Sequence, residues 1–383
     1  MLDISVFYCG LKLKNPIIVS SAGTTETFDH MKRCQEFGAG AVVMKSYFEK
    51  KEYRQDATPH FKIIRRKYGD FRCDTLYSSE QASKFDRDGY ANEISRAKKH
   101  LEIPIIANID CYDLTKSVEA AKIFAEAGAD ALEIKACPHG ELSMSGKSYE
   151  QTMLSVLEGI KKDVNIPVIV KHVAQLSNPV ASSLKLERGG VDGLVLFNRF
   201  AGLDIDINSE TPIMHGGYAG HGGLWSIYYS IRWISALYPK VKIPICGSGG
   251  VYNGEDIIKY ILSGATCVSI CTSIILNGYE IIEKMKKELE KWMKQKNYNT
   301  INDFLGKAAE RVKGIDEYKR GREVIASINQ DICKSCGKCE KICFHQAINH
   351  LDKKFIINSN KCKGCGLCEQ ICPFGAIKMI KDI

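Results

Sequence analysis

Two cysteine runs near the C-terminus constrain the fold of this chain more than any other feature. Both have the spacing Cys-x2-Cys-x2-Cys-x3-Cys. Their members are Cys333, Cys336, Cys339, Cys343, Cys362, Cys365, Cys368 and Cys372. Structural zinc sites instead use Cys-x2-Cys pairs separated by a longer gap. Thiolates spaced by two residues wrap around one face of an iron–sulfur cube, so the doubled run predicts two [4Fe–4S] clusters.

The doubled run resembles that of the bacterial two-cluster ferredoxins, in which the fourth cysteine of each run ligates the other cluster. The resemblance assigns Cys333, Cys336, Cys339 and Cys372 to one cluster, and Cys362, Cys365, Cys368 and Cys343 to the other. Phe344 follows Cys343 where those ferredoxins usually have proline. We expect this change to alter the potential of one cluster and to leave its binding intact.

The chain has 383 residues, which is too long for a ferredoxin alone. Upstream of the cysteine runs, near-continuous apolar segments alternate with amphipathic ones. We expect strands at 16–20, 41–45, 103–109, 131–136, 166–171, 193–197, 243–246 and 267–271. We expect helices near 27–37, 90–100, 116–127, 149–161, 180–187, 224–237, 255–263 and 279–294. Apolar strands between helices indicate a parallel sheet buried on both faces, and eight such units predict an α/β TIM barrel.

The expected organisation is a (β/α)8 barrel over residues 1–295, a linker over 296–325 and an α+β ferredoxin-like domain over 326–383. Several helix-to-strand junctions contain glycine, for example Glu126-Ala-Gly-Ala-Asp-Ala and Leu262-Ser-Gly-Ala. A glycine just past a helix adopts the left-handed conformation that ends it. These glycines therefore indicate structure and not chemistry.

The carboxyl ends of the strands form the active face of such a barrel. Gly249 and Gly250 follow the seventh expected strand and Thr272 follows the eighth. Glycines and hydroxyls at these positions are typical of a phosphate site. Lys45 and Lys171 close the second and fifth strands, and we expect both to point into the barrel mouth. A cation there suits the electron-rich edge of a reduced flavin.

Motifs at these strand ends resemble the dihydroorotate and dihydropyrimidine dehydrogenase family of FMN barrels over most of residues 1–295. They are Asn15-Pro16, Ala22-Gly23, Lys45-Ser46, Cys137-Pro138-His139-Gly140, Lys171, Asn198, Gly247-Ser-Gly-Gly250 and Cys271-Thr272. With the cluster runs, the arrangement is most similar to the pyrimidine-reducing part of dihydropyrimidine dehydrogenases. The resemblance implies an FMN enzyme that interconverts a C=C bond and its dihydro form. It implies FMN contacts from Ala22, Gly23, Lys45, Ser46, Asn108, Lys171, Gly249, Gly250 and Thr272.

Cys137 matches the residue that acts as general acid/base in that family, exchanging a proton with a substrate carbon while the flavin exchanges a hydride. A lone cysteine is otherwise often a small buried hydrophobe. The alternative that a histidine acts as the general acid instead of Cys137 stays open, because four histidines fall near expected strand ends: His139, His172, His215 and His221. His139 is also a candidate substrate contact. We expect the glycine-rich stretch 216–223 to be a mobile loop near the phosphate side.

The pyrimidine-binding asparagines of the family are mostly absent. Ile134 lies three residues before Cys137 where the family has asparagine, unless that asparagine is lost with a one-residue deletion. Ser78 lies at about the position where the family usually has another asparagine. Asn198 is kept, but Arg199 follows it in place of a small hydroxyl residue. The planar fork of arginine matches a carboxylate, which favours an orotate-like substrate or an unsaturated acid; a surface ion pair is the alternative.

Composition limits the location and the partners. Eight further cysteines scatter through expected strands and helices, as reduced thiols in a cytosolic protein do. The N-terminus does not resemble a signal peptide, and no apolar run reaches membrane-spanning length. The net charge is +8, but the lysine-rich patches fall on the solvated face of an amphipathic helix. We therefore expect a cytoplasmic protein with neither a nucleic-acid nor a membrane partner.

No Gly-x-Gly-x-x-Gly motif follows an expected strand, which predicts that NAD(P)H or FAD binds elsewhere. We expect an NAD(P)H/FAD reductase subunit or a soluble ferredoxin as electron partner, and the resemblance implies a homodimer or heterotetramer. Two other functions stay open. One is an electron-transfer subunit whose barrel binds flavin without pyrimidine chemistry. The other is a non-redox barrel, such as a phospho-ligand lyase or isomerase, that uses the ferredoxin module for assembly.

Overall fold

A computed structural model of the protein describes residues 2–68, 71–79, 82–111, 113–135, 148–215, 217–352 and 354–382. The chain divides into two compact units, Met1–Val312 and Lys313–Ile383. The finer domain and linker boundaries drawn from the sequence stay predictions.

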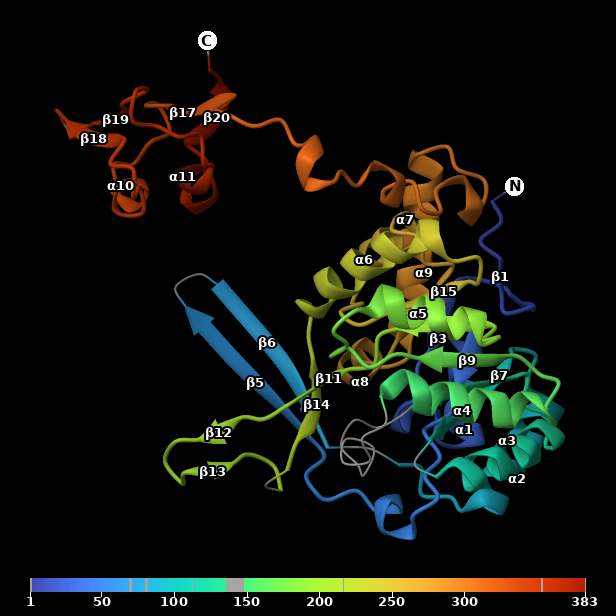
Figure 1. The fold of residues 1–383 in the computed structure, drawn as a ribbon. Helices are drawn as coiled ribbons and strands as arrows, with labels where there is room; N and C mark the ends of the chain where they lie inside the picture. The colour runs from blue at the N-terminus through green and yellow to red at the C-terminus, as the bar shows by residue number, and fades with distance from the viewer. Residues whose placement is uncertain are drawn as a thin grey trace. The chain divides into compact units, whose positions relative to one another are not determined.

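The first unit is built on a closed barrel of eight parallel strands, which confirms the TIM-barrel prediction (Figure 1). In order around the barrel the strands are β3 (Ile17–Val19), β4 (Ala41–Val43), β7 (Ile105–Asp110), β8 (Ala131–Lys135), β9 (Val168–Lys171), β10 (Gly193–Leu196), β15 (Ile245–Ser248) and β16 (Cys267–Ile270). Nearly every residue of these strands is buried. This burial explains why their sequences read as near-continuous apolar runs.

Helices cover the outside of the barrel and bury their apolar stripes against it (Figure 1). They are α1 (Phe28–Glu36), α2 (Arg87–His100), α3 (Leu114–Glu126), α4 (Tyr149–Lys161), α5 (Pro179–Arg188), α6 (Ser226–Leu237), α7 (Gly254–Leu262), the short α8 (Thr272–Asn277) and α9 (Glu280–Gln295). Gly128 and Gly264 follow α3 and α7 with φ of +100° and +108°, as the junction motifs predicted. Asp130, in the first of these junctions, accepts a hydrogen bond from the backbone nitrogen of Ile105 and pairs with Lys98.

A second, antiparallel sheet was not predicted from the sequence. Its strands lie in the order β11 (Phe200–Gly202), β14 (Ala219–Gly222), β6 (Phe71–Ser78) and β5 (Phe61–Tyr68). β5 and β6 form a long ribbon that projects from the barrel, next to the short pair β12 (Ile205–Asp206) and β13 (Thr211–Pro212) (Figure 1). The expectation of a mobile loop over 216–223 was wrong for β14, because this strand pairs with β6 on one side and with β11 on the other.

The second unit has an internal repeat. β17 (Val324–Ile328) pairs with β20 (Ile377–Lys381), and β18 (Ile348–Leu351) pairs with β19 (Lys354–Ile357). Two short helices lie side by side (Figure 1). In sequence, α10 (Lys338–Lys341) lies between β17 and β18, and α11 (Leu367–Ile371) lies between β19 and β20. Each is preceded by a glycine in the left-handed conformation. The α+β ferredoxin-like fold was therefore predicted correctly.

Of the helices in the described ranges, none combines the length and the apolar character needed to cross a bilayer.

Three aromatic side chains under the barrel mouth support one of the expected site residues. Phe124 packs against Tyr90 and Tyr47, with ring centroids 4.5 and 5.1 Å away. The Tyr90 hydroxyl accepts a hydrogen bond from the backbone nitrogen of Asn108 at 3.1 Å. All three rings are buried, so this cluster fixes the end of β7 from behind.

We expect Phe124→Ala to lower the free energy of unfolding of the barrel unit by about 3–5 kcal/mol, because it leaves a cavity among packed rings. All three tryptophans, Trp225, Trp233 and Trp292, belong to this unit, so urea unfolding followed by tryptophan fluorescence measures it. Leu114→Ala, on an exposed side of the same helix, is the control and should change the value by less than about 0.5 kcal/mol. Equal effects of the two changes would contradict the packing described here.

Candidate active site

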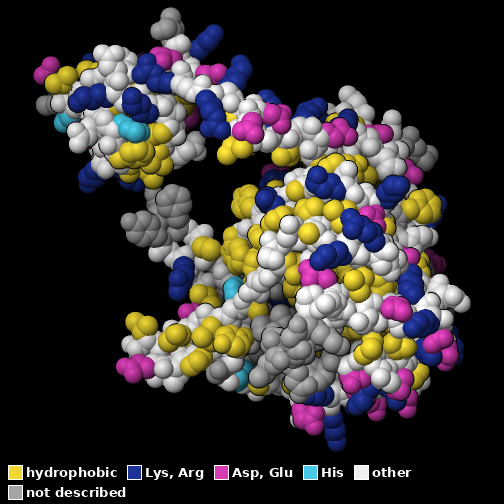
Figure 2. All heavy atoms as spheres, in the orientation of Figure 1, with side chains coloured by type: hydrophobic (Ala, Val, Ile, Leu, Met, Phe, Trp, Pro, Cys, Tyr) yellow, Lys and Arg dark blue, Asp and Glu magenta, His cyan; other side chains and the backbone are white. Residues whose placement is uncertain are grey.

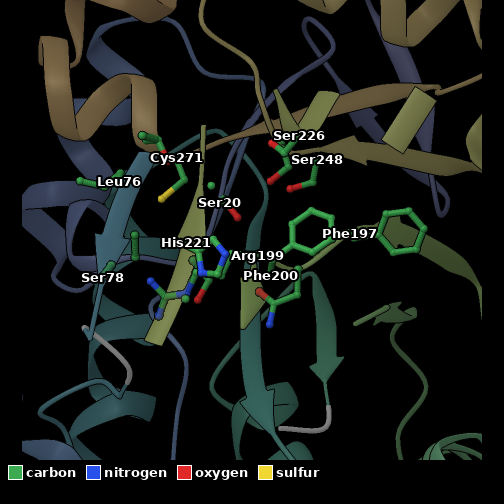
Figure 3. Close-up of a pocket in the computed structure, with 18 of the residues that line it drawn as sticks. Ser20, Leu76, Ser78, Phe197, Arg199, Phe200, His221, Ser226, Ser248 and Cys271 are labelled. Carbon is green, nitrogen blue, oxygen red and sulfur yellow. The ribbon is translucent and has the colours of Figure 1, made fainter. Parts of the chain in front are cut away.

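A cavity opens at the carboxyl ends of the barrel strands, with the antiparallel sheet as its outer wall (Figure 3). The structure brings seven of the expected flavin contacts to its lining: Ala22, Ser46, Asn108, Lys171, Gly249, Gly250 and Thr272. Three of the expected substrate contacts also line it: Ser78, Asn198 and Arg199. Cys137 and His139 lie outside the described residues. The cavity is therefore shared by both expected sets.

Gly23 and Lys45 are not part of the lining. Lys45 was expected to point into the mouth, but its ammonium lies 3.1 Å from Asp56 and 3.8 Å from Glu26, and its side chain is 7% exposed. Lys45 therefore forms ion pairs with both carboxylates. Of the two strand-closing lysines, Lys171 is the one that lines the cavity.

A buried carboxylate organises the floor of the cavity. Oε1 of Glu133 accepts a hydrogen bond from Nδ2 of Asn108 at 2.6 Å and lies 3.5 Å from Nζ of Lys171. Lys171 also donates to Oγ of Ser20 at 3.0 Å. Glu133, Asn108 and Lys171 come from the adjacent strands β8, β7 and β9, and all three are at most 5% exposed. Burying a lysine is costly unless its charge is paired, and Glu133 supplies that pairing.

Lys135 lines the cavity but was not predicted from the sequence as a site residue. Side chains alternate along β8, so Glu133 and Lys135 face the cavity side while Ile134 is fully buried in the core. Nζ of Lys135 lies 2.9 Å from Oδ2 of Asp110 and above the ring of Phe48. Lys135, the residue after Ile134, therefore presents a cation to the cavity. A charged residue two places after Glu133 in an apolar strand was the available signal.

The loop after β15 forms a close-packed cradle. Gly249 and Gly250 have φ of +102° and +68°. A Cβ atom on Gly250 would lie 2.6 Å from the backbone nitrogen of Ile227, so this loop lies directly against the start of α6. The Tyr260 hydroxyl fixes the loop by donating to the carbonyl of Gly249 at 2.6 Å. Only glycine fits both the conformation and the space at position 250.

Three polar atoms of the cavity lining are buried without a hydrogen-bond partner among the atoms that the structure describes. They are Oδ1 of Asn108, Nδ1 of His221 and Oγ of Ser269. Buried polar atoms in native proteins are almost always satisfied. Together with the glycine cradle and the paired Lys171, these atoms suit a polar cofactor that carries a phosphate.

Arg199 and His221 form the outer wall of the cavity, near Ser78 (Figure 3). Both lie close against the backbone of the antiparallel sheet: a Cβ atom on Gly220 would lie 2.1 Å from Nε of Arg199, and one on Gly202 would lie 2.0 Å from the His221 ring. Burial lowers the pKa of His221, and the charge of Arg199 lowers it further. Arg199 therefore supplies the positive charge of this pair on the cavity wall.

Of the four candidate histidines, the structure describes His172, His215 and His221, and these three lie in different surroundings. His172 is buried, with its ring nitrogens 3.1 Å from the Tyr149 hydroxyl and 3.0 Å from the Ser183 hydroxyl. Burial lowers its pKa to about 4, so it is neutral at pH 7. His215 contacts the carbonyl of Pro59. Among the histidines that the structure describes, His221 is the one that lines the cavity.

The second unit gathers its cysteines around two small cavities. One is lined by Cys333, Cys336, Cys339 and Cys372, and the other by Cys343, Cys362, Cys365 and Cys368. These are the two crossed sets that the sequence predicted.

The fourth cysteine of each run has the same backbone contact. The amide of Ala347 donates to Sγ of Cys343, and that of Ala376 donates to Sγ of Cys372, both at 3.3 Å. Hydrogen bonds to cluster sulfurs tune the reduction potential. Phe344 therefore leaves this contact of Cys343 in place, although it replaces the proline found after Cys372.

Comparison with known proteins agrees with both sites. Residues 3–293 match the dihydroorotate dehydrogenase family, and residues 326–379 match the 4Fe-4S dicluster domain. The catalytic subunit of dihydroorotate dehydrogenase B (NAD(+)) from Methanocaldococcus jannaschii is 30% identical over 315 residues, which are 79% of this chain and 97% of that protein. The NAD-dependent dihydropyrimidine dehydrogenase subunit PreA from Escherichia coli K12 is 26% identical over 369 residues, 92% of this chain and 88% of that protein.

The family binds FMN, and the dicluster match indicates two [4Fe–4S] clusters. Both cofactors are consistent with the cavities described above. The chain therefore belongs to the dihydroorotate dehydrogenase family, as an FMN oxidoreductase acting on CH–CH groups whose barrel is joined to a [4Fe–4S] dicluster domain.

Proposed function

We propose that the protein interconverts a C=C bond and its dihydro form in a pyrimidine-like substrate, with electrons relayed through the two [4Fe–4S] clusters. One observation carries the proposal. Seven of the nine expected FMN contacts and three of the four expected substrate contacts line a single cavity, which lies between the barrel mouth and the antiparallel sheet.

The barrel side of the cavity would hold FMN. Gly249, Gly250 and Thr272 would receive the phosphate, and Lys171 and Asn108 would contact the ring system. When bound, FMN supplies hydride exchange with a substrate carbon and accepts or donates single electrons. Glu133 orients Lys171, because its carboxylate lies 3.5 Å from the buried ammonium.

Other residues of the lining would select the substrate. Asn198 and Ser78 offer hydrogen bonds to a ring, whereas Arg199 and Lys135 offer positive charge. The carboxylate of Asp110 forms an ion pair with the ammonium of Lys135. Cations in place of the amides of the family favour a substrate with an anionic group, so a carboxylate-bearing pyrimidine fits this wall better than uracil does. The same observation supports the second candidate function, reduction of an unsaturated carboxylic acid that has no pyrimidine ring.

Proton exchange with the substrate carbon is assigned to Cys137. This residue follows β8, whose last residue Lys135 lines the cavity. A thiol is a suitable acid for this step because it can give and regain one proton near neutral pH. The assignment depends on the family motif in the sequence.

The electron partner is proposed to be an NAD(P)H/FAD reductase subunit or a soluble ferredoxin, in a homodimeric or heterotetrameric assembly. Two relatives are themselves named as subunits. The cytoplasm is the proposed location. The described cysteines outside the two cluster runs form no disulfide, which agrees with a reducing compartment.

The substrate class can be established with anaerobically purified protein reduced by dithionite. We expect orotate or an unsaturated acid to reoxidise the flavin, and uracil and thymine to do so more slowly. Reoxidation by uracil or thymine alone would favour dihydropyrimidine chemistry. Failure of every compound would favour a barrel that only carries electrons.

Cys137→Ser should lower turnover with the best substrate by about 10²–10⁴-fold, because a hydroxyl is a much weaker acid than a thiol. Stopped-flow reoxidation of the reduced flavin measures this step, and visible absorbance shows whether FMN is retained. Cys73→Ser, at an exposed cysteine of β6, is the matched control and should keep the wild-type rate. Unchanged turnover in Cys137→Ser would rule out its role as the acid.

Arg199→Ala should raise KM for a carboxylate-bearing substrate by about 10–100-fold and change KM for a neutral analogue much less, because the lost contact is with the anionic group. The comparison requires steady-state kinetics with orotate and uracil. Arg66→Ala, at an exposed arginine of the same antiparallel sheet, serves as the control. Equal effects on both substrates would show that Arg199 does not read the carboxylate.

A further inference from the structure

Three exposed lysines line the two cluster cavities. Lys334 and Lys338 belong to the lining that contains Cys333, Cys336, Cys339 and Cys372, and Lys363 belongs to the other. We call these three side chains the cluster-rim lysines. Their position places positive charge at the points where the clusters come nearest to solvent.

The internal repeat places two of these lysines equivalently. Lys334 follows Cys333, and Lys363 follows Cys362, the first cysteine of each run. Two residues further along, Cys336 and Cys365 are both exposed. Each cluster is therefore expected to present one edge at the surface, with a lysine beside it. Electron exchange between proteins requires this kind of access.

The charge of Lys334 and Lys363 is not neutralised locally. Neither has a carboxylate within ion-pairing distance among the residues that the structure describes, whereas Lys378, elsewhere on the same unit, lies 3.8 Å from Glu369. Residues 313–383 contain 13 lysines and arginines against 8 acidic residues. Two oxidised clusters with their thiolates bring about four negative charges, which leaves the unit near neutral. Attraction for a charged partner therefore depends on the lysines at the two cavities. Figure 2 shows several Lys and Arg side chains on the visible face of this unit.

Apolar side chains accompany the lysines. Phe374 shares the cavity lining of Lys334, and Leu367 shares that of Lys363; they are 47% and 43% exposed. Exposed apolar groups surrounded by charge are typical of protein interaction sites. Small interfaces of this kind suit electron-transfer partners that must bind and leave quickly.

We propose that the cluster-rim lysines form the docking site for an acidic electron-carrier protein. The inference rests on the proposed function, because that function requires an external electron carrier. The reduced carrier binds with its carboxylates against the lysines and gives one electron to a cluster, so the carrier is oxidised as the cluster is reduced. Two such encounters deliver the electron pair that the reduction of one C=C bond consumes; in the opposite direction the carrier accepts electrons.

The test uses the complete holoenzyme under anaerobic conditions and a two-[4Fe–4S] ferredoxin of strongly negative net charge as the probe. The variant is Lys334→Glu/Lys363→Glu. The matched control is Lys354→Glu/Lys381→Glu, which reverses two exposed lysines that line neither cavity on the same unit. Iron content and visible absorbance establish that both variants retain their clusters. Stopped-flow measurements then give the association rate constant at several ionic strengths.

We expect the rim variant to lower the association rate constant about tenfold or more at low salt and to flatten its dependence on ionic strength. The control should remain within about twofold of the wild type. Equal effects of the two variants would overturn the proposal, as would an unchanged salt dependence in the rim variant. A shift in cluster potential without a change in association would also overturn it, because the lysines would then act on the clusters alone.

Reduction by dithionite followed by substrate addition distinguishes this proposal from the proposed function. That route bypasses the carrier, so the rim variant should turn over substrate at the wild-type rate. If dithionite-driven turnover is absent in the wild type, the proposed function fails. If it is present and the carrier binds the rim variant normally, the docking proposal alone fails.

Discussion

The active site depends on one buried ion pair. Glu133 lies in the middle strand of three and holds Lys171 on one side and Asn108 on the other. In water a carboxylate and an ammonium gain little by pairing, but in this interior an unpaired partner would be strongly destabilising. The pair fixes two polar groups at the barrel mouth before any ligand arrives, so the site is organised in advance. The aromatic cluster behind Asn108 provides the same rigidity through packing.

The barrel and the cluster unit could be predicted because their signals are local. Buried parallel strands read as apolar runs, and cluster ligands have fixed spacing. The antiparallel sheet could not be predicted in the same way. β14 is rich in glycine and becomes a strand only by pairing with β6 and β11, which are distant in sequence. Its pairing also places Arg199 and His221 on the cavity wall, and the sequence alone does not predict this arrangement.

The site residues show the same limit. Lys45 and Lys171 both close an apolar strand, but Lys45 pairs with Glu26 and Asp56, which come from other parts of the chain, and is not in the cavity lining. Lys135 was not predicted as a site residue, because the family motif places its asparagine opposite Ile134. The alternation of side chains along β8 instead places Lys135 in the cavity lining. The sequence thus identified the cofactors better than it identified the substrate. Substrate contacts come from several strands whose relative register no single motif records.

The central proposal is that electrons pass between FMN in the barrel and the two [4Fe–4S] clusters. An anaerobic titration tests this most directly: the fully dithionite-reduced protein is mixed with an excess of its best substrate, and flavin absorbance and the electron paramagnetic resonance of the reduced clusters are followed together. The account predicts that both signals reoxidise and that the product formed equals all the electrons stored in flavin and clusters. Absence of flavin, or clusters that stay reduced after the flavin is reoxidised, would contradict it.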